Sequence, residues 1–495
     1  MSRLRAIAVF TAIMPALSSA QEQFQKIDQL RRIDVVAVDR QGRPVTSLQK
    51  TDFRVQEDNK TRDIVFFRFT GTQTMPGVQG HFSNGAGALR GATVILIDLL
   101  SDSTLGGAVF SYQITQAFKN LSSTDDLYLY FLTSRGELYS IHSLPQLDGE
   151  LAPASQRWTE NLSPMLDAAL KKFNGFKPVD DRTAAARWDL TARALRTLGG
   201  QMQLVSGRRN LVWVTRGIPL VGGLDFSYRE HLLCDALQRA QIAVYPVGAA
   251  LGTERDLALD DMAALTGGRR YAYGEVSDAV RDSQADARAN YQIAFLTPEE
   301  KPDGAHHKLR VRCLNKDVKL ETLTGFSGLA APLTPEEAGR KVLEVALHNP
   351  LDASDIGLRA SVSPDSGMPR RMRFEIRVNP VDLLPGETPQ PSVKILFLVA
   401  AYGPSADRGA INSLDINPMS EDATITRTGI VRVDQPCEPV TLDIHLSPQQ
   451  YEVAAREGIV LHGSASVDSR VQKVRVIVVD SRLAAAGSVT LAMRQ

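Results

Sequence analysis

The feature that most constrains the fold is the stretch 91–103, an almost continuous run of apolar and β-branched residues that ends in Asp98 and small polar residues. A strand that is covered on both faces lacks the polar–apolar alternation of a half-exposed strand, and parallel sheets flanked by helices contain such strands. The stretch therefore predicts a buried central strand. Ligand sites in open sheets of this kind lie at the carboxyl ends of the strands, where Asp98 stands.

The polar residues that follow this strand have two interpretations. Asp98 and Ser103 could simply begin the next helix, because Asp and Ser are favourable N-cap residues. Alternatively, Asp98, Ser101, Asp102 and Ser103 could line a binding site at the edge of the sheet. The residues alone favour the capping interpretation.

The length and charge of the chain limit its class. A chain of 495 residues exceeds what one hydrophobic core supports, so we expect two to four domains. Lys plus Arg equals Asp plus Glu at 56 each, which argues against a nucleic-acid-binding protein with a large basic face. Cys234, Cys313 and Cys437 form no Cys-x-x-Cys motif, and we expect them to be buried as small apolar residues.

Residues 1–20 have the order of a secretory signal peptide. Arg3 and Arg5 precede an apolar segment at 6–17, and small residues follow up to Ala20. The apolar segment is short for a helix that spans a bilayer. We expect cleavage after Ala20, export to the periplasm, the outer envelope or the medium, and no transmembrane span in the mature chain.

The next part of the chain changes its apolar period twice. Strand patterns within 21–70 predict an N-terminal β module, and the Gly-rich stretch 71–90 predicts a mobile linker. Strands alternate with helices over 91–290, which predicts a mainly parallel sheet covered by helices.

The last part of the chain has period-two segments typical of β structure. Residues 291–328 predict a β meander that we expect to pair with 32–70, so that the α/β region is inserted into one β module. Residues 340–495 predict a C-terminal domain that is β throughout and forms a two-sheet, Ig-like sandwich.

An ordered set of motifs over about residues 33–328 resembles the von Willebrand factor type A domain. More narrowly, it resembles the exported "VWFA-related" proteins typical of Acidobacteria. The resemblance implies an α/β, Rossmann-like fold, a central, mostly parallel sheet flanked by helices, between all-β modules. The motifs are the Asp98 strand tip, the strand and loop at 211–219, the strand at 242–248, Leu-Thr-Gly-Gly at 265–268, and three flanking patterns at 36–45, 52–59 and 291–298.

The resemblance also implies a metal-ion-dependent adhesion site, which this sequence alters. In the family, an Asp-x-Ser-x-Ser loop, a Thr and an acidic residue hold a divalent ion. Here Leu100 and Asp102 stand where the two serines belong, and Arg216 stands where an acidic residue is usual. A cation there opposes metal binding, although Asp98, Asp102 and Ser103 could hold Mg²⁺ or Mn²⁺ after a local shift. We therefore expect a degenerate site that requires no cofactor.

The sequence favours binding over catalysis. It contains no Gly-x-Ser-x-Gly elbow, no His-Glu-x-x-His helix and no phosphate loop. His306 and His307 fall in a predicted hairpin loop, where exposure is expected, and a transition-metal site there would need further ligands that the sequence does not name. We expect a non-catalytic adhesion or scaffold protein that binds a protein partner, with an acidic side chain of the partner as the simplest match for Arg216. The expected contact residues are Asp98, Ser101, Ser103, Thr215 and Arg216.

Two alternatives remain open at this point. A carbohydrate-active or hydrolytic protein would have its site in the C-terminal β domain, where Phe397, Tyr402 and Tyr451 are the aromatic candidates. A purely structural envelope protein would have no discrete site.

Overall fold

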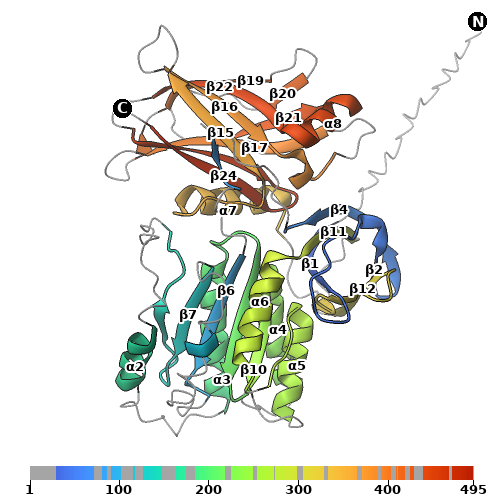
Figure 1. The fold of residues 1–495 in the computed structure, drawn as a ribbon, viewed down its shortest axis with the longest axis vertical. Helices are drawn as coiled ribbons and strands as arrows, with labels where there is room; N and C mark the ends of the chain where they lie inside the picture. The colour runs from blue at the N-terminus through green and yellow to red at the C-terminus, as the bar shows by residue number, and fades with distance from the viewer. Residues whose placement is uncertain are drawn as a thin grey trace, which may run out of the picture.

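The computed structural model describes residues 29–71, 81–85, 91–101, 115–117, 126–147, 162–173, 184–217, 224–248, 254–272, 274–297, 305–327, 333–364, 371–386, 392–402, 408–409, 411–418, 424–428, 439–467 and 471–493. Figure 1 shows three parts, which we call the small β module, the mixed-sheet domain and the C-terminal sandwich. The signal peptide expected at 1–20 lies outside the described residues.

The small β module combines segments from both sides of the mixed-sheet domain. β11 (Tyr291–Thr297) pairs antiparallel with β1 (Gln29–Val38) and β4 (Ile64–Phe69), and β12 (His306–Cys313) pairs antiparallel with β2 (Phe53–Glu57). The sequence predicted pairing between these two segments. The module contains two sheets, in the order β13 (Lys319–Glu321), β1 (Gln29–Val38), β11 (Tyr291–Thr297), β4 (Ile64–Phe69) and in the order β14 (Gly325–Ser327), β12 (His306–Cys313), β2 (Phe53–Glu57), β3 (Lys60–Arg62), with a 3₁₀ turn at Lys50–Asp52.

Tyr291 fixes the core of the small β module. Its ring contacts Phe53 and Phe67, with ring centroids 5.3 and 5.5 Å away. Its hydroxyl accepts a hydrogen bond from the backbone N–H of Leu48 and donates one to the carbonyl of Val45. The Tyr291 hydroxyl therefore has both a hydrogen-bond donor and an acceptor as partners, so burial of this side chain leaves no unpaired polar group.

The mixed-sheet domain is built on five strands. Their order is β10 (Ile242–Gly248), β9 (Arg208–Thr215), β6 (Gly91–Asp98), β7 (Leu127–Leu132) and β8 (Leu138–His142). β8 is antiparallel to β7, and the other neighbours are parallel. Every residue of β6 is buried, as the apolar run predicted. A central strand covered on both faces explains why this run has no alternation.

Helices cover both faces of this sheet. One face packs against α3 (Ala184–Met202), α4 (Leu224–Arg239) and α5 (Glu254–Thr266), and its core includes Trp188 and Trp213. The other face packs against α2 (Leu162–Phe173) and α6 (Val276–Arg288). None of the described helices is long and apolar enough to cross a membrane.

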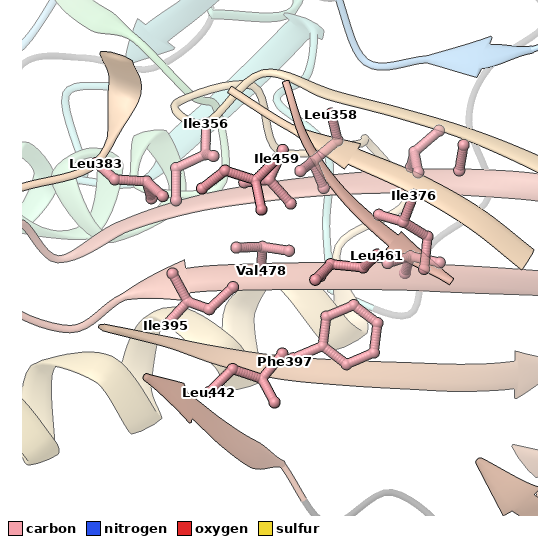
Figure 2. Close-up of a cluster of buried hydrophobic side chains, with 14 of the residues drawn as sticks. Ile356, Leu358, Ile376, Leu383, Ile395, Phe397, Leu442, Ile459, Leu461 and Val478 are labelled. Carbon is pink, nitrogen blue, oxygen red and sulfur yellow. The ribbon is translucent and has the colours of Figure 1, made fainter. Parts of the chain in front are cut away.

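The C-terminal sandwich has two antiparallel sheets. Figure 2 shows side chains from both, such as Ile376 and Phe397, packed in the space between them. The alternating pattern of β16 (Arg371–Val378) buries Phe374, Ile376 and Val378, as expected from period two. One sheet is ordered β19 (Ile411–Pro418), β22 (Ile459–Val467), β16 (Arg371–Val378), β15 (Leu358–Pro364), β5 (Phe82–Ser83), and the other is ordered β20 (Thr424–Thr428), β21 (Val440–His445), β17 (Ser392–Tyr402), β23 (Lys473–Asp480), β24 (Ala485–Ala492), with β18 (Arg408–Gly409) beside β17.

Two helices correct the prediction that this domain is β throughout. α7 (Pro335–His348) and α8 (Pro448–Glu457) each begin with a capping box, Thr334 with Glu337 and Ser447 with Gln450. Proline at the first helical position adds to each signal, because its fixed φ suits a helix start. Both signals are present in the sequence, but the prediction followed the strand patterns of the neighbouring segments and did not use them. A short 3₁₀ turn, Pro380–Asp382, lies between strands β16 and β17.

Part of the linker expected at 71–90 is a strand. Phe82 and Ser83 form β5, which pairs with β15 at the edge of the C-terminal sandwich. The buried Asn84 amide donates to the carbonyls of Ala353 and Ile356, and its oxygen accepts from the N–H of Leu358. The chain is therefore fastened to the sandwich immediately before β6.

The fold class predicted from the sequence, an α/β Rossmann-like von Willebrand factor type A fold, is contradicted. Over the described residues the chain is mostly β, and four of its five sheets are antiparallel throughout. A parallel core occurs only in the mixed sheet, so no clear Rossmann-like core defines the chain. The alternation at 91–290 dominated the prediction, whereas most strands come from the flanking segments.

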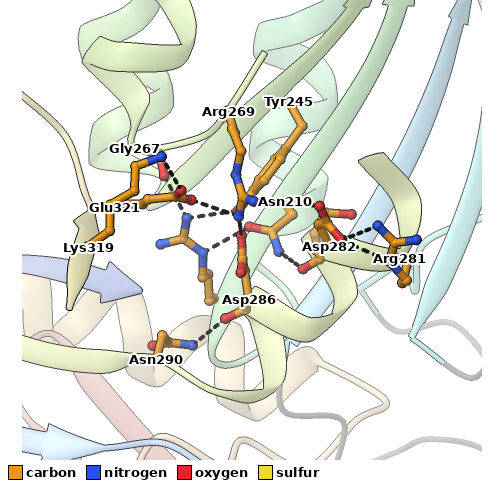
Figure 3. Close-up of polar contacts among 12 residues, drawn as sticks. Asn210, Tyr245, Gly267, Arg269, Arg281, Asp282, Asp286, Asn290, Lys319 and Glu321 are labelled. Atoms are coloured by element: carbon orange, nitrogen blue, oxygen red, sulfur yellow. Dashed lines mark hydrogen bonds and ion pairs between the residues drawn. The ribbon is translucent and has the colours of Figure 1, made fainter. Parts of the chain in front are cut away.

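Polar contacts join the three parts near the amino ends of the parallel strands. Figure 3 shows Arg269, which pairs with Asp286 of α6 and with Glu321 of the small β module at 3.0 and 2.7 Å. Arg68 of β4 pairs with the buried Asp382 at 2.9 Å. The Gly207 N–H, just before β9, donates to Asp355. The carboxyl ends of the parallel strands lie at the opposite end of the sheet.

Candidate functional site

The candidate site lies where β6 and β9 end side by side. Ile97 of β6 pairs with Val214 of β9, so the next residues, Asp98 and Thr215, are neighbours although 117 positions separate them. The Thr215 hydroxyl donates to Asp98 Oδ2 at 2.9 Å. Parallel pairing therefore brings together two residues that the sequence analysis assigned to one site.

The Asp98 carboxylate organises the loop that follows its own strand. Its Oδ1 accepts hydrogen bonds from the backbone N–H groups of Leu100 and Ser101, at 3.1 and 3.0 Å. The Ser101 hydroxyl donates back to the Asp98 carbonyl at 2.8 Å. This local pattern is an Asp-initiated turn, and it uses the side chain to replace backbone partners at the strand end.

Asp98 is an unusual carboxyl group because of its burial. Its relative exposure is 1%. Removal from water raises its pKa to about 6, although the hydrogen bonds from Ser101 and Thr215 act in the opposite direction. A buried group with a strongly shifted pKa at a strand end is a candidate functional group on physical grounds.

The loop after β9 turns the chain outward at Arg216. The Arg216 N–H donates to the Ser101 hydroxyl at 3.1 Å, which ties the two loops together, and the Arg216 side chain is exposed. Gly217 follows with φ of +106°, a conformation that side chains disfavour. Gly248 is the last residue of the neighbouring strand β10. A Cβ at this position would lie 1.8 Å from the Thr215 carbonyl oxygen, so the ends of β10 and β9 can lie this close only because residue 248 is glycine.

The residues described here do not fit a divalent metal ion. Asp98 is the one carboxylate of the four described site residues, and both of its oxygens already accept hydrogen bonds. The hydroxyls of Ser101 and Thr215 are also engaged, and a guanidinium lies nearby. Among the described residues, no group of three or more His, Cys, Asp or Glu side chains is arranged to hold a metal. Asp102 and Ser103, the other proposed ligands, lie outside the described residues.

The aromatic residues considered for a sugar site do not gather on one surface. Phe397 is fully buried in the core of the C-terminal sandwich. The Tyr402 hydroxyl donates to the Leu347 carbonyl of α7 at 2.7 Å. Tyr451 is half-buried against the same core. These three side chains serve packing.

The sequence analysis missed Gly248 and Gly217 as parts of the site. Both glycines shape the end of the sheet: Gly217 adopts a positive φ, and Gly248 lies against the carbonyl of Thr215, which is distant in sequence. The sequence signal was the position of each glycine at or just beyond the end of a buried β run, where a chain that must turn or approach another backbone needs glycine.

Comparison with known proteins adds little. No protein-family model and no curated protein matches the chain. Among solved structures, the human COPII-coat protein Sec24c is similar at 9% sequence identity and a TM-score of 0.26. That match covers 54% of this chain and spans about half, 50%, of the Sec24c chain. A similarity this low carries no argument about fold or function.

Proposed function

We propose that this chain is an exported, non-catalytic binding or scaffold protein that presents the strand-tip face of its mixed sheet to a protein partner. We call the group Asp98, Ser101, Thr215 and Arg216 the strand-tip site; Asp98 and Thr215 are its buried base, and Arg216 is its exposed residue. Arg216 receives a carboxylate of the partner, because a guanidinium can donate two parallel hydrogen bonds to one carboxylate. Ser103 extends the site in this proposal, and residues 1–20 direct the export.

One observation supports this proposal most strongly: the strand-tip site separates a buried anion from an exposed cation. Asp98 is turned inward and bonded to Leu100, Ser101 and Thr215, so its role is to hold the two loops. Arg216 is exposed and its backbone is tied to Ser101. A charged side chain on a fixed backbone loses less conformational entropy on binding than one on a flexible loop.

The arrangement of the three parts also favours this face. The contacts of the small β module and the C-terminal sandwich with the mixed sheet include Arg269 with Glu321 and Gly207 with Asp355, both near the amino ends of the strands. The strand-tip site lies at the other end. The resemblance to exported VWFA-related proteins is part of the same proposal and rests on the motifs given above.

A selection experiment tests the proposed function. A phage-displayed peptide library is selected against the chain from Gln21, and enriched peptides should contain Asp or Glu. Arg216→Asp should weaken their binding by about tenfold to a hundredfold, the equivalent of about 1.5–3 kcal/mol for charge-assisted hydrogen bonds. Arg196→Asp, at another exposed arginine on α3, is the matched control. Equal binding by the Arg216 variant and the wild type would contradict the proposal.

A further inference from the structure

Two histidines from different parts of the chain face each other at the junction of α4 and the small β module. The ring centroids of His231 on α4 and His306 on β12 are 5.7 Å apart, with an angle of 33° between the rings. His306 begins a strand, so the predicted hairpin loop was wrong at this position. The sequence could not pair these residues, because 75 positions separate them.

The neighbouring His307 belongs to a different contact. Consecutive strand residues point to opposite faces. The His307 ring stacks on Phe326 at 5.2 Å, and its Nδ1 lies 2.9 Å from Asp58 Oδ2. His231 and His306 are therefore a pair of their own.

The backbone around this pair is held in place by a second contact between the same elements. Gln238 lies seven residues after His231 and so on the same face of α4. Its Nε2 donates to the Gly325 carbonyl of β14 at 2.8 Å. A Cβ on Gly325 would come within 2.4 Å of His306 Nε2, so the absence of a side chain there leaves room for the His306 imidazole.

The separation of the two rings suits a shared metal ion. Two imidazoles that share one ion through Zn–N bonds of about 2.0–2.1 Å hold their ring centres roughly 5–6 Å apart. Water can reach the pair, since His306 is exposed and His231 is partly exposed.

We propose that His231 and His306 bind a transition-metal ion of the zinc class and thereby join α4 to β12. Imidazole is a preferred ligand of such ions. In this proposal the two imidazoles are the protein ligands and water completes the coordination. The proposed site is separate from the strand-tip site, and neither depends on the other.

Titration of Zn²⁺ into the full chain tests this proposal. We expect one saturable site in the wild type, and a loss of at least about tenfold in affinity in His231→Gln and in His306→Gln, since even outer partners of metal ligands are worth that much. His445→Gln, at a histidine of the C-terminal sandwich, is the control and should bind as the wild type does. Equal affinity in all four proteins, or no saturable binding by the wild type, would overturn the proposal.

Two further measurements keep the test decisive if a histidine variant folds poorly. Electron paramagnetic resonance of Cu²⁺ bound to the wild type should show two imidazole nitrogens, and a signal from one or none would overturn the proposal. Asp98→Ala should retain the Zn²⁺ site. Loss of the ion in that variant would place it at the strand tips instead.

Discussion

Replacing Asp98 with asparagine should stabilise the protein at neutral pH. Burial raises the pKa of the folded-state carboxyl group from 3.8 to about 6. Ionising it therefore costs the folded state about 3 kcal/mol more than it costs the unfolded state, since one pKa unit is worth about 1.4 kcal/mol. Asparagine keeps an oxygen for the N–H groups of Leu100 and Ser101 and carries no charge, so the variant avoids this cost.

The pH dependence gives this prediction its sign. Between about pH 4 and pH 6 the folded state keeps the Asp98 proton while the unfolded state releases it. This carboxyl group therefore contributes stability below about pH 4 that is lost as the pH rises through about 6. The advantage of Asp98→Asn should appear over the same range and level off above it.

Urea denaturation at pH 4 and pH 7.5, followed by tryptophan fluorescence, measures the effect. The difference in unfolding free energy between Asp98→Asn and the wild type should grow by about 2.5 kcal/mol between these two pH values, because the unfolded-state carboxyl group is already partly ionised at pH 4. Asp167→Asn, at an exposed position of α2, is the matched control and should show no such change. A difference that does not depend on pH, or a variant that is less stable at pH 7.5, would refute the reasoning.

Two contacts between distant segments should also be important for stability. Arg68→Met leaves the buried Asp382 without its cation and should lower the unfolding free energy by about 3 kcal/mol in chemical denaturation; a loss below about 1 kcal/mol would show that the pair matters little. Asn84→Ala removes three hydrogen bonds, including the side-chain acceptor of the buried Leu358 N–H, so we expect a loss of about 2–4 kcal/mol. Equal stability of the alanine variant and the wild type would argue against β5 as a fastening point.

The sequence predicted those features that depend on local patterns. The apolar run that begins at residue 91 predicted the buried strand β6, and the period-two pattern of the last part of the chain predicted strands such as β16. The two polar loops predicted Asp98, Ser101, Thr215 and Arg216 as one group, and parallel pairing of β6 with β9 brings them together. These features can be predicted from a short segment because coverage of a strand on one face or on both determines its own pattern of apolar and polar residues.

Features that depend on distant partners escaped prediction. Asn84 looks like part of a flexible linker until Leu358 and Ile356 supply its hydrogen-bond partners. The fold class failed for a related reason, since the alternation at 91–290 was given more weight than the antiparallel sheets that the rest of the chain forms. The capping boxes at Thr334 and Ser447 are different, because they are local and were overlooked beside strong strand patterns.

The most direct test of the strand-tip site is a double-mutant cycle on one acidic peptide from the selection. The binding free energies of the peptide and of its Asp→Asn or Glu→Gln form are measured by calorimetry against the wild type and Arg216→Gln. If Arg216 binds the peptide carboxylate, the two changes should be coupled by about 1.5–3 kcal/mol. Additive effects, with coupling below about 0.3 kcal/mol, would show that Arg216 and the carboxylate do not meet and would contradict the central claim.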